Sequence, residues 1–138
     1  MEEIRLHVET EINPTESQEK VEEAVRNIFG EIDLRVKPLH KASLLVGDSK
    51  GKESITQLRD LLRREHIRTA AHAVLMEGMD KKAVNFCLNK QVAYVGHISF
   101  SKETAESPLG PIRVKIECTD PRELVEWLAP RTTSKTGW

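Results

Sequence analysis

The sequence predicts an α+β fold: a single domain with a mainly antiparallel sheet and helices packed on one face. The chain has 138 residues, the usual size of one domain, and no linker divides it. Segments of alternating apolar and polar residues, typical of half-buried strands, are interspersed with segments of helical period. Hairpin-length connections in the C-terminal half favour antiparallel pairing. We expect the order β-α-β-β-α-α-β-β-β-α over residues 1–130 and a flexible C-terminal tail over residues 131–138.

The first strand and the first helix are clearly marked. Apolar and polar residues alternate over residues 4–12, which is the period of a strand with one buried face. We expect Thr15 to cap the helix that follows, with Gln18 completing a capping box. The apolar residues of this segment share one helical face, and Gly30 ends the helix in a left-handed conformation.

The middle of the chain predicts two more strands. Alternation over residues 32–36 indicates a strand, which Pro38 stops or marks as an edge. The apolar run 44–46 indicates a short third strand before the turn-rich segment Gly47–Gly51.

Residues 55–75 are helical but do not form one simple helix. The apolar residues of 55–62 and those of 67–75 lie on roughly opposite sides of a continuous helix. Such a helix is either buried on two sides or bent, and we favour a bend near Glu65 and His66, which form a polar joint. Gly78 ends this segment.

The C-terminal part predicts three strands and a helix. We expect strands over residues 84–88, 92–100 and 112–118, with a hairpin turn at Asn89-Lys90-Gln91. The last helix begins with Asp120 as its cap and a proline in the first turn, and it ends before Pro130.

Composition excludes several classes of protein. With 38% apolar and 31% charged residues, the chain reads as soluble and globular, and a net charge of −1 excludes a uniformly basic surface. No apolar run is long enough to span a membrane, and the acidic start does not resemble a signal peptide. Cys87 and Cys118 lie on different strand phases, so we expect two buried thiols and a cytoplasmic protein.

Charge is unevenly distributed along the chain. Residues 1–33 carry a net charge of −7 and the remainder carries +6. Arg64, Arg68 and His72 recur every four residues and would line one side of a continuous helix. Basic residues of this kind either contact the phosphates of RNA or form a solvated face that the acidic first helix partly neutralises. The candidate nucleic-acid-binding residues are Lys50, Lys52, Arg63, Arg64, Arg68 and Lys90.

Catalytic chemistry has little support. The segment Gly47–Ser54 resembles a phosphate-binding loop but is one residue too short, and Glu53 stands where a hydroxyl is needed. A small nucleotide-binding protein or enzyme that uses this segment is the alternative to a non-catalytic protein. Neither the histidines nor the cysteines have metal-ligand spacing, so we expect no metal and no cofactor. The loop Ser107–Pro111 is either a preorganised binding loop or a rigid turn.

Four segments together resemble an archaeal family of uncharacterised proteins, number 201 in the series of that name. They are Pro14-Thr15-Glu16, Leu88-Asn89-Lys90-Gln91 with Ala93, Ser107-Pro108-Leu109-Gly110, and Trp127-Leu128-Ala129-Pro130. The resemblance implies an antiparallel α+β fold similar to RNA-binding ribosomal proteins of the large subunit. It also implies a homodimer and supplies no catalytic residue. Thr69 and His72 stand where the family more usually has an acid and an arginine. RNA is thus a possible partner.

Overall fold

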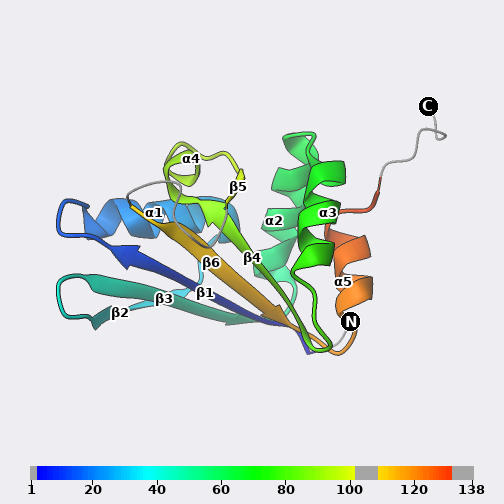
Figure 1. The fold of residues 1–138 in the computed structure, drawn as a ribbon, viewed down its shortest axis with the longest axis horizontal. Helices are drawn as coiled ribbons and strands as arrows, with labels where there is room; N and C mark the ends of the chain where they lie inside the picture. The colour runs from blue at the N-terminus through cyan, green and yellow to red at the C-terminus, as the bar shows by residue number, and fades with distance from the viewer. Residues whose placement is uncertain (1–2, 102–108, 132–138) are drawn as a thin grey trace.

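The computed structural model describes residues 3–101 and 109–131, which form one antiparallel sheet and the helices that cover it (Figure 1). The strands are β1 (Arg5–Ile12), β2 (Asp33–Pro38), β3 (Ser43–Lys50), β4 (Ala83–Asn89), β5 (Phe100–Ser101) and β6 (Pro111–Glu117). The helices are α1 (Gln18–Phe29), α2 (Glu53–Arg64), α3 (Arg68–Glu77), α4 (Lys90–Tyr94) and α5 (Pro121–Leu128). The strand order β2-β3-β1-β6-β4-β5 places the first strand in the middle of the sheet.

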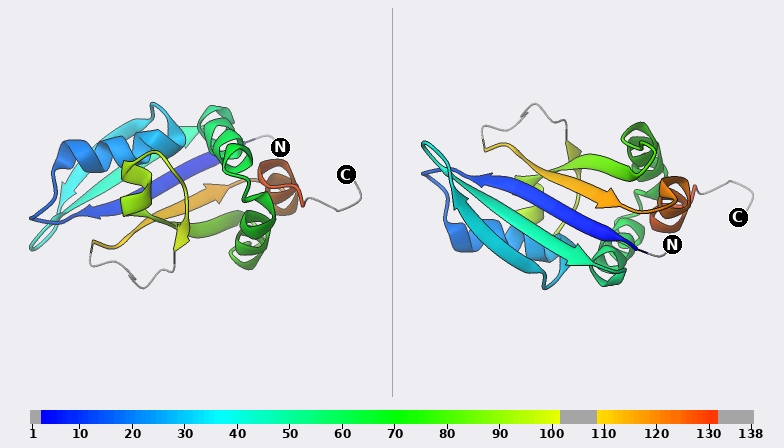
Figure 2. Two further views of the ribbon diagram at one scale, coloured as in Figure 1. Left: turned by 90° about the horizontal axis from the view of Figure 1, so that it is seen from above. Right: turned by 90° about the horizontal axis from the view of Figure 1, so that it is seen from below.

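One face of the sheet packs against the helices, as the strand alternation predicts. In β1, Leu6 and Val8 are buried, whereas His7 and Glu9, which alternate with them, point to the other face. Seen from below, this other face lies in front of α1 (Figure 2). The α+β prediction, with an antiparallel sheet and helices on one face, is confirmed.

The predicted cap of the first helix is wrong by two residues. The helix begins at Gln18, and the cap is Ser17, whose hydroxyl accepts a hydrogen bond from the Lys20 amide at 3.4 Å. Thr15 is exposed in the preceding loop. The end of the helix is as expected: Gly30 has a φ of 79°, which favours glycine.

The segment predicted as a turn after residue 46 is strand. Residues Gly47–Lys50 continue β3 and pair with β1, with Gly47 opposite Val8 and Asp48 opposite His7. A Cβ at position 47 would lie 2.8 Å from a methyl group of Leu34, so a larger residue there would require the Leu34 side chain to move. Pro38 ends the edge strand β2, as expected.

The bend between α2 and α3 is confirmed. The chain turns between Arg64 and Arg68, where His66 has a φ of 59°. Gly78 ends α3, as expected, with a φ of −90°. A Cβ on Gly78 would overlap the carbonyl oxygen of Asn85 in β4, which explains why this position needs glycine.

The strand predicted over residues 92–100 is wrong, and so is the hairpin turn before it. The Asn89 side chain caps the short helix α4 by accepting a hydrogen bond from the Val92 amide at 3.0 Å. Only Phe100 and Ser101 form strand, as β5 against β4. The chain is helical over Lys90–Tyr94 and forms neither helix nor strand over residues 95–99.

The last helix is as predicted. The Asp120 side chain accepts a hydrogen bond from the Glu123 amide at 3.1 Å, and Pro121 occupies the first turn. The predicted tail beyond residue 131 and the Ser107-Pro108 part of the proline-rich loop lie outside the described residues.

Candidate nucleic-acid interface

Three basic residues form a stripe along one side of α2. Arg59 and Arg63 follow Lys52 by seven and eleven residues, so all three lie within about 20° of one line along the helix. The stripe is about 16 Å long, at a rise of about 1.5 Å per residue. The apolar residues of α2 face the core, which leaves these cations at the surface. We call Lys52, Arg59 and Arg63 the α2 stripe.

An aromatic side chain lies against the first half of this stripe. Trp127 of α5 is half-buried, and the Arg59 guanidinium lies 4.3 Å from its ring centroid. The Lys52 ammonium lies 5.4 Å from the same centroid. Each contact is a cation–π interaction, which orders a long, otherwise mobile basic side chain. In the sequence Trp127 belongs to one of the segments that carry the family resemblance, and nothing there connects it with the basic residues.

Acidic groups reduce the charge of the α2 stripe only in part. The Asp60 carboxylate accepts a hydrogen bond from Arg63 at 3.3 Å and lies 3.8 Å from Arg59, so one acid serves two arginines. In the acidic helix α1, the Glu22 carboxylate forms an ion pair with Arg26 of the same helix. Within residues 3–101 and 109–131, no ion pair joins an acid of α1 to a base of α2.

A small hollow lies at the corner between α2 and α3. It has a volume of about 120 Å³ and is lined by Arg63, His66, Arg68 and Thr69. On a continuous helix Arg63 and Arg68 would lie about 140° apart. The bend at His66 brings them to the same hollow.

The remaining predicted residues are not gathered at this place. Lys50 is exposed at the end of β3, and Arg64 points about 100° away from Arg63 around α2. The expected line of Arg64, Arg68 and His72 is wrong because the helix is broken. His72 is buried, and its Nδ1 donates a hydrogen bond to the Ala129 carbonyl at 2.9 Å.

Lys90, predicted as a phosphate contact, instead lies inside the protein. Its side chain is 0% exposed and lies 3.1 Å from the Glu16 carboxylate, which is 5% exposed. The ammonium also donates hydrogen bonds to the carbonyls of Glu11, at 2.6 Å, and Leu109, at 2.8 Å. All three of its protons therefore have partners, and Lys90 cannot reach a ligand at the surface.

The surroundings of this ion pair set its protonation. Burial would raise the pKa of Glu16, but hydrogen bonds from Asn13 and Tyr94, together with the one from Lys90, hold it below its usual range. Burial lowers the pKa of Lys90, and the Glu16 carboxylate opposes this effect only in part. Burial and the same carboxylate raise the pKa of Tyr94. We call Glu16, Lys90 and Tyr94 the buried cluster.

The alternative phosphate-binding loop is not formed. Residues 47–50 are paired strand, as described above, so their amides do not surround a ligand. The Ser54 hydroxyl is buried and donates a hydrogen bond to the Ser49 hydroxyl at 3.1 Å. The segment therefore joins β3 to α2 without forming a phosphate-binding loop.

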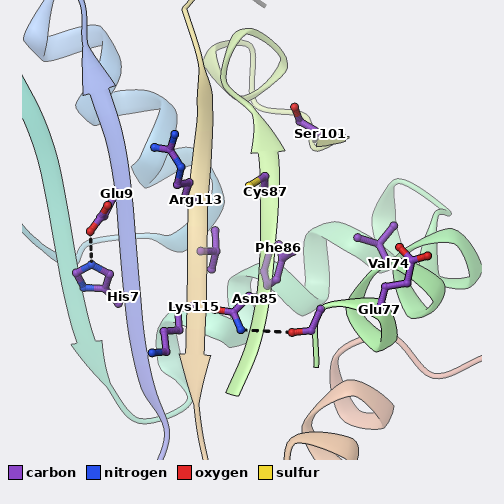
Figure 3. A pocket seen from close by; sticks show the side chains of 12 residues that line it. His7, Glu9, Val74, Glu77, Asn85, Phe86, Cys87, Ser101, Arg113 and Lys115 are labelled. Carbon is purple, nitrogen blue, oxygen red and sulfur yellow. Dashed lines mark hydrogen bonds and ion pairs between the residues drawn. The ribbon is translucent and has the colours of Figure 1, made fainter. Parts of the chain in front are cut away.

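A broader hollow of about 560 Å³ lies on the uncovered face of the sheet and reaches α3 (Figure 3). There His7 stands between two carboxylates, with Nε2 3.0 Å from Glu9 and Nδ1 2.8 Å from Asp48. Burial would lower the pKa of His7, but the hydrogen bonds to Glu9 and Asp48 outweigh it and raise this pKa. Lys115 also has an acidic neighbour, since Glu117 lies at 3.5 Å. Positive and negative groups alternate here, unlike on the α2 stripe.

The part of the chain that the structure describes contains neither a metal-binding cluster nor a helix that could span a membrane. Within it, no three or more His, Cys, Asp or Glu side chains gather in a way that would hold a metal ion. Among these same residues, no helix has the length and apolar character needed to cross a membrane.

Comparison with known proteins shows which family the chain belongs to. A family model described as RNA binding matches residues 5–118. A UPF0201 protein from Aeropyrum pernix is 39% identical over 132 residues, covering 94% of this chain and 87% of its own length. The chain belongs to the UPF0201 family. A second UPF0201 protein, from Sulfolobus acidocaldarius, is 40% identical over 128 residues and covers 93% of this chain and 88% of its own.

Solved structures agree with this assignment. The crystal structure of a UPF0201 protein from Methanococcus jannaschii has a TM-score of 0.84 and 33% identity, covering 94% of this chain and 96% of that one. A DUF54 protein from Methanothermobacter thermautotrophicus, with a TM-score of 0.61 at 20% identity, shares the fold. The resemblance to the archaeal family is thus confirmed, and the likeness to ribosomal proteins stays a prediction.

The geometry also shows what the sequence reasoning missed. Arg59 was not among the candidate residues, although its spacing from Lys52 and Arg63 is visible in the sequence. No sequence signal connects α2 with Trp127, because the contact depends on how α5 packs.

Proposed function

We propose that this UPF0201 protein binds the phosphate backbone of RNA, and that the residues of the α2 stripe contact the phosphates. The observation that carries the proposal is the alignment of Lys52, Arg59 and Arg63 on one side of a helix, with Trp127 against two of them. The RNA-binding description of the matching family model supports the same function.

The proposed contacts are electrostatic and do not read the base sequence. Lysine and arginine release counterions when they neutralise phosphates, which is the main source of non-specific affinity. Trp127 contacts two cations and is a single aromatic side chain, so it does not form the series of aromatic platforms that single-strand binders use. We therefore expect similar affinity for RNAs of different sequence.

Fluorescence anisotropy with labelled RNA between about 50 and 200 mM salt tests the proposal. We expect the logarithm of the affinity to fall linearly with the logarithm of salt, with a slope of about −2 to −3 for three or four contacts. Arg59→Gln and Arg63→Gln should each weaken binding for every sequence and reduce the slope by about 1.

A control is available on α1, whose first turn lies at the other end of the molecule from α2 (Figure 1). Lys20 is exposed there, so Lys20→Gln removes one charge without touching the α2 stripe. Affinity independent of salt, or equal losses in Lys20→Gln and Arg59→Gln, would contradict the proposed surface.

The proposed role is that of a binding protein without catalytic activity, and the RNA-binding description of the family supports it. Homodimer formation and a cytoplasmic location stay predictions from the sequence. Sedimentation equilibrium of the whole chain tests the first of these.

A further inference from the structure

The hollow between α2 and α3 is built by the bend rather than by either helix alone. After α2 ends, the His66 amide donates to the Arg63 carbonyl at 3.1 Å, and the Ile67 amide donates to the Leu62 carbonyl at 3.2 Å. These hydrogen bonds hold the corner in one shape. Two arginines and a histidine therefore face the same space of about 120 Å³ before any ligand is bound.

The charge of this hollow is positive. Its lining contains Arg63, His66, Arg68 and Thr69 and no acidic residue. Two acids stand nearby. The Asp60 carboxylate accepts a hydrogen bond from one nitrogen of Arg63, whose guanidinium has five N–H donors in all. The Glu65 carboxylate lies 2.8 Å from Nδ1 of His97. The hollow thus keeps several cationic donors for an anion.

The size of the hollow suits a small anionic group. Its volume of about 120 Å³ is room for a group of the size of a phosphate. Arg63 belongs both to the hollow and to the α2 stripe, so a backbone that follows the stripe reaches the hollow at its end.

We infer that the hollow lined by Arg63, His66 and Arg68 binds the terminal phosphate of an RNA strand that lies along the α2 stripe. This inference rests on the proposed function. A terminal phosphate has three oxygens outside the ester bond and a charge of about −1.5 to −2, whereas a phosphate within the chain has two oxygens and one charge. Two guanidinium groups match the terminal group better in charge and in number of donors.

Short oligoribonucleotides of one sequence, with a 5′-phosphate, a 3′-phosphate or hydroxyl groups at both ends, test the inference by anisotropy. We expect one of the phosphorylated forms to bind about tenfold more tightly than the hydroxyl form. Arg68→Gln should remove this preference and keep the affinity for the hydroxyl form. Arg64→Gln is the matched control, since Arg64 lies close in sequence but points away from the hollow, and it should keep the preference.

The outcomes separate this inference from the proposed function. Equal binding of the three RNAs by the unaltered protein, or a preference that survives in Arg68→Gln, overturns the inference while RNA binding itself stands. Failure to bind any of them overturns both. Circular dichroism shows whether Arg68→Gln folds. If it does not, the affinities of the unaltered protein for the three RNAs test the inference by themselves.

Discussion

Replacing Lys90 by methionine should strongly destabilise the protein. The change keeps a long, flexible side chain but removes the ammonium group. The Glu16 carboxylate, 5% exposed, then stays buried without its cation. The carbonyls of Glu11 and Leu109 lose a donor at the same time.

The expected cost is about 3–5 kcal/mol, the usual result of removing one partner of a buried ion pair. Desolvation dominates, because an unpaired buried charge cannot recover its hydration. A domain of this size is stable by about 5–15 kcal/mol, so the loss is a large share of the total. At a urea dependence of about 2 kcal/mol per molar, the unfolding midpoint should fall by about 2 M.

Equilibrium urea unfolding at neutral pH measures this loss. Lys20→Met is the control, because Lys20 is exposed and the chemical change is the same. The double variant Glu16→Leu with Lys90→Met should recover part of the stability, since it leaves no unpaired charge. If Lys90→Met lowers the free energy of unfolding by less than about 1 kcal/mol, the reasoning is refuted, because the buried Glu16 carboxylate would then not need this lysine as its partner.

The buried cluster also predicts how stability depends on acid. The pKa of Glu16 is lowered in the folded protein from a usual value of 4.5, so its contribution is complete above that pH. The contribution is lost as the pH falls through the lowered pKa. Glu16→Gln should therefore flatten the acid limb of a plot of unfolding free energy against pH, and an unchanged acid limb would contradict this assignment.

Three further predictions concern other elements. Gly78→Ala should cost about 1–3 kcal/mol or more in thermal unfolding, because its Cβ would overlap the Asn85 carbonyl; an unchanged melting temperature would contradict this packing. Ser17→Ala should cost about 0.5–1 kcal/mol and Thr15→Ala almost nothing, and the reverse order would restore the cap expected from sequence. The pKa of His7 is raised above 6.5, so its contribution is complete below that pH and is lost as the pH rises through the raised value; His7→Gln should remove this loss, as followed by urea unfolding against pH.

Most of the fold could be predicted because its signals are local. Alternation identified β1, and opposed apolar stripes identified the bend at His66. The strand expected over residues 92–100 failed because a short apolar run is compatible with both a strand and a helical turn. Lys90, the first residue of α4, contacts Glu16, which lies 74 residues away in the sequence, and no local pattern reveals this contact.

The candidate site was predictable to a smaller extent. Lys52 and Arg63 were identified from charge alone, and their alignment with Arg59 follows from helical spacing. Lys90 was misplaced because a lysine within an expected hairpin turn is normally exposed. Its burial depends on a carboxylate and two carbonyls supplied by three separate segments, which only the tertiary structure brings together.

The position of β1 in the sheet has a consequence for synthesis on the ribosome. Its two neighbours are β3 and β6, and β6 begins only at Pro111. As the chain emerges from its N-terminus, β1 has one neighbour and one unpaired edge until residues 111–117 have left the exit tunnel. Until then, that edge of β1 is open to pairing with other chains.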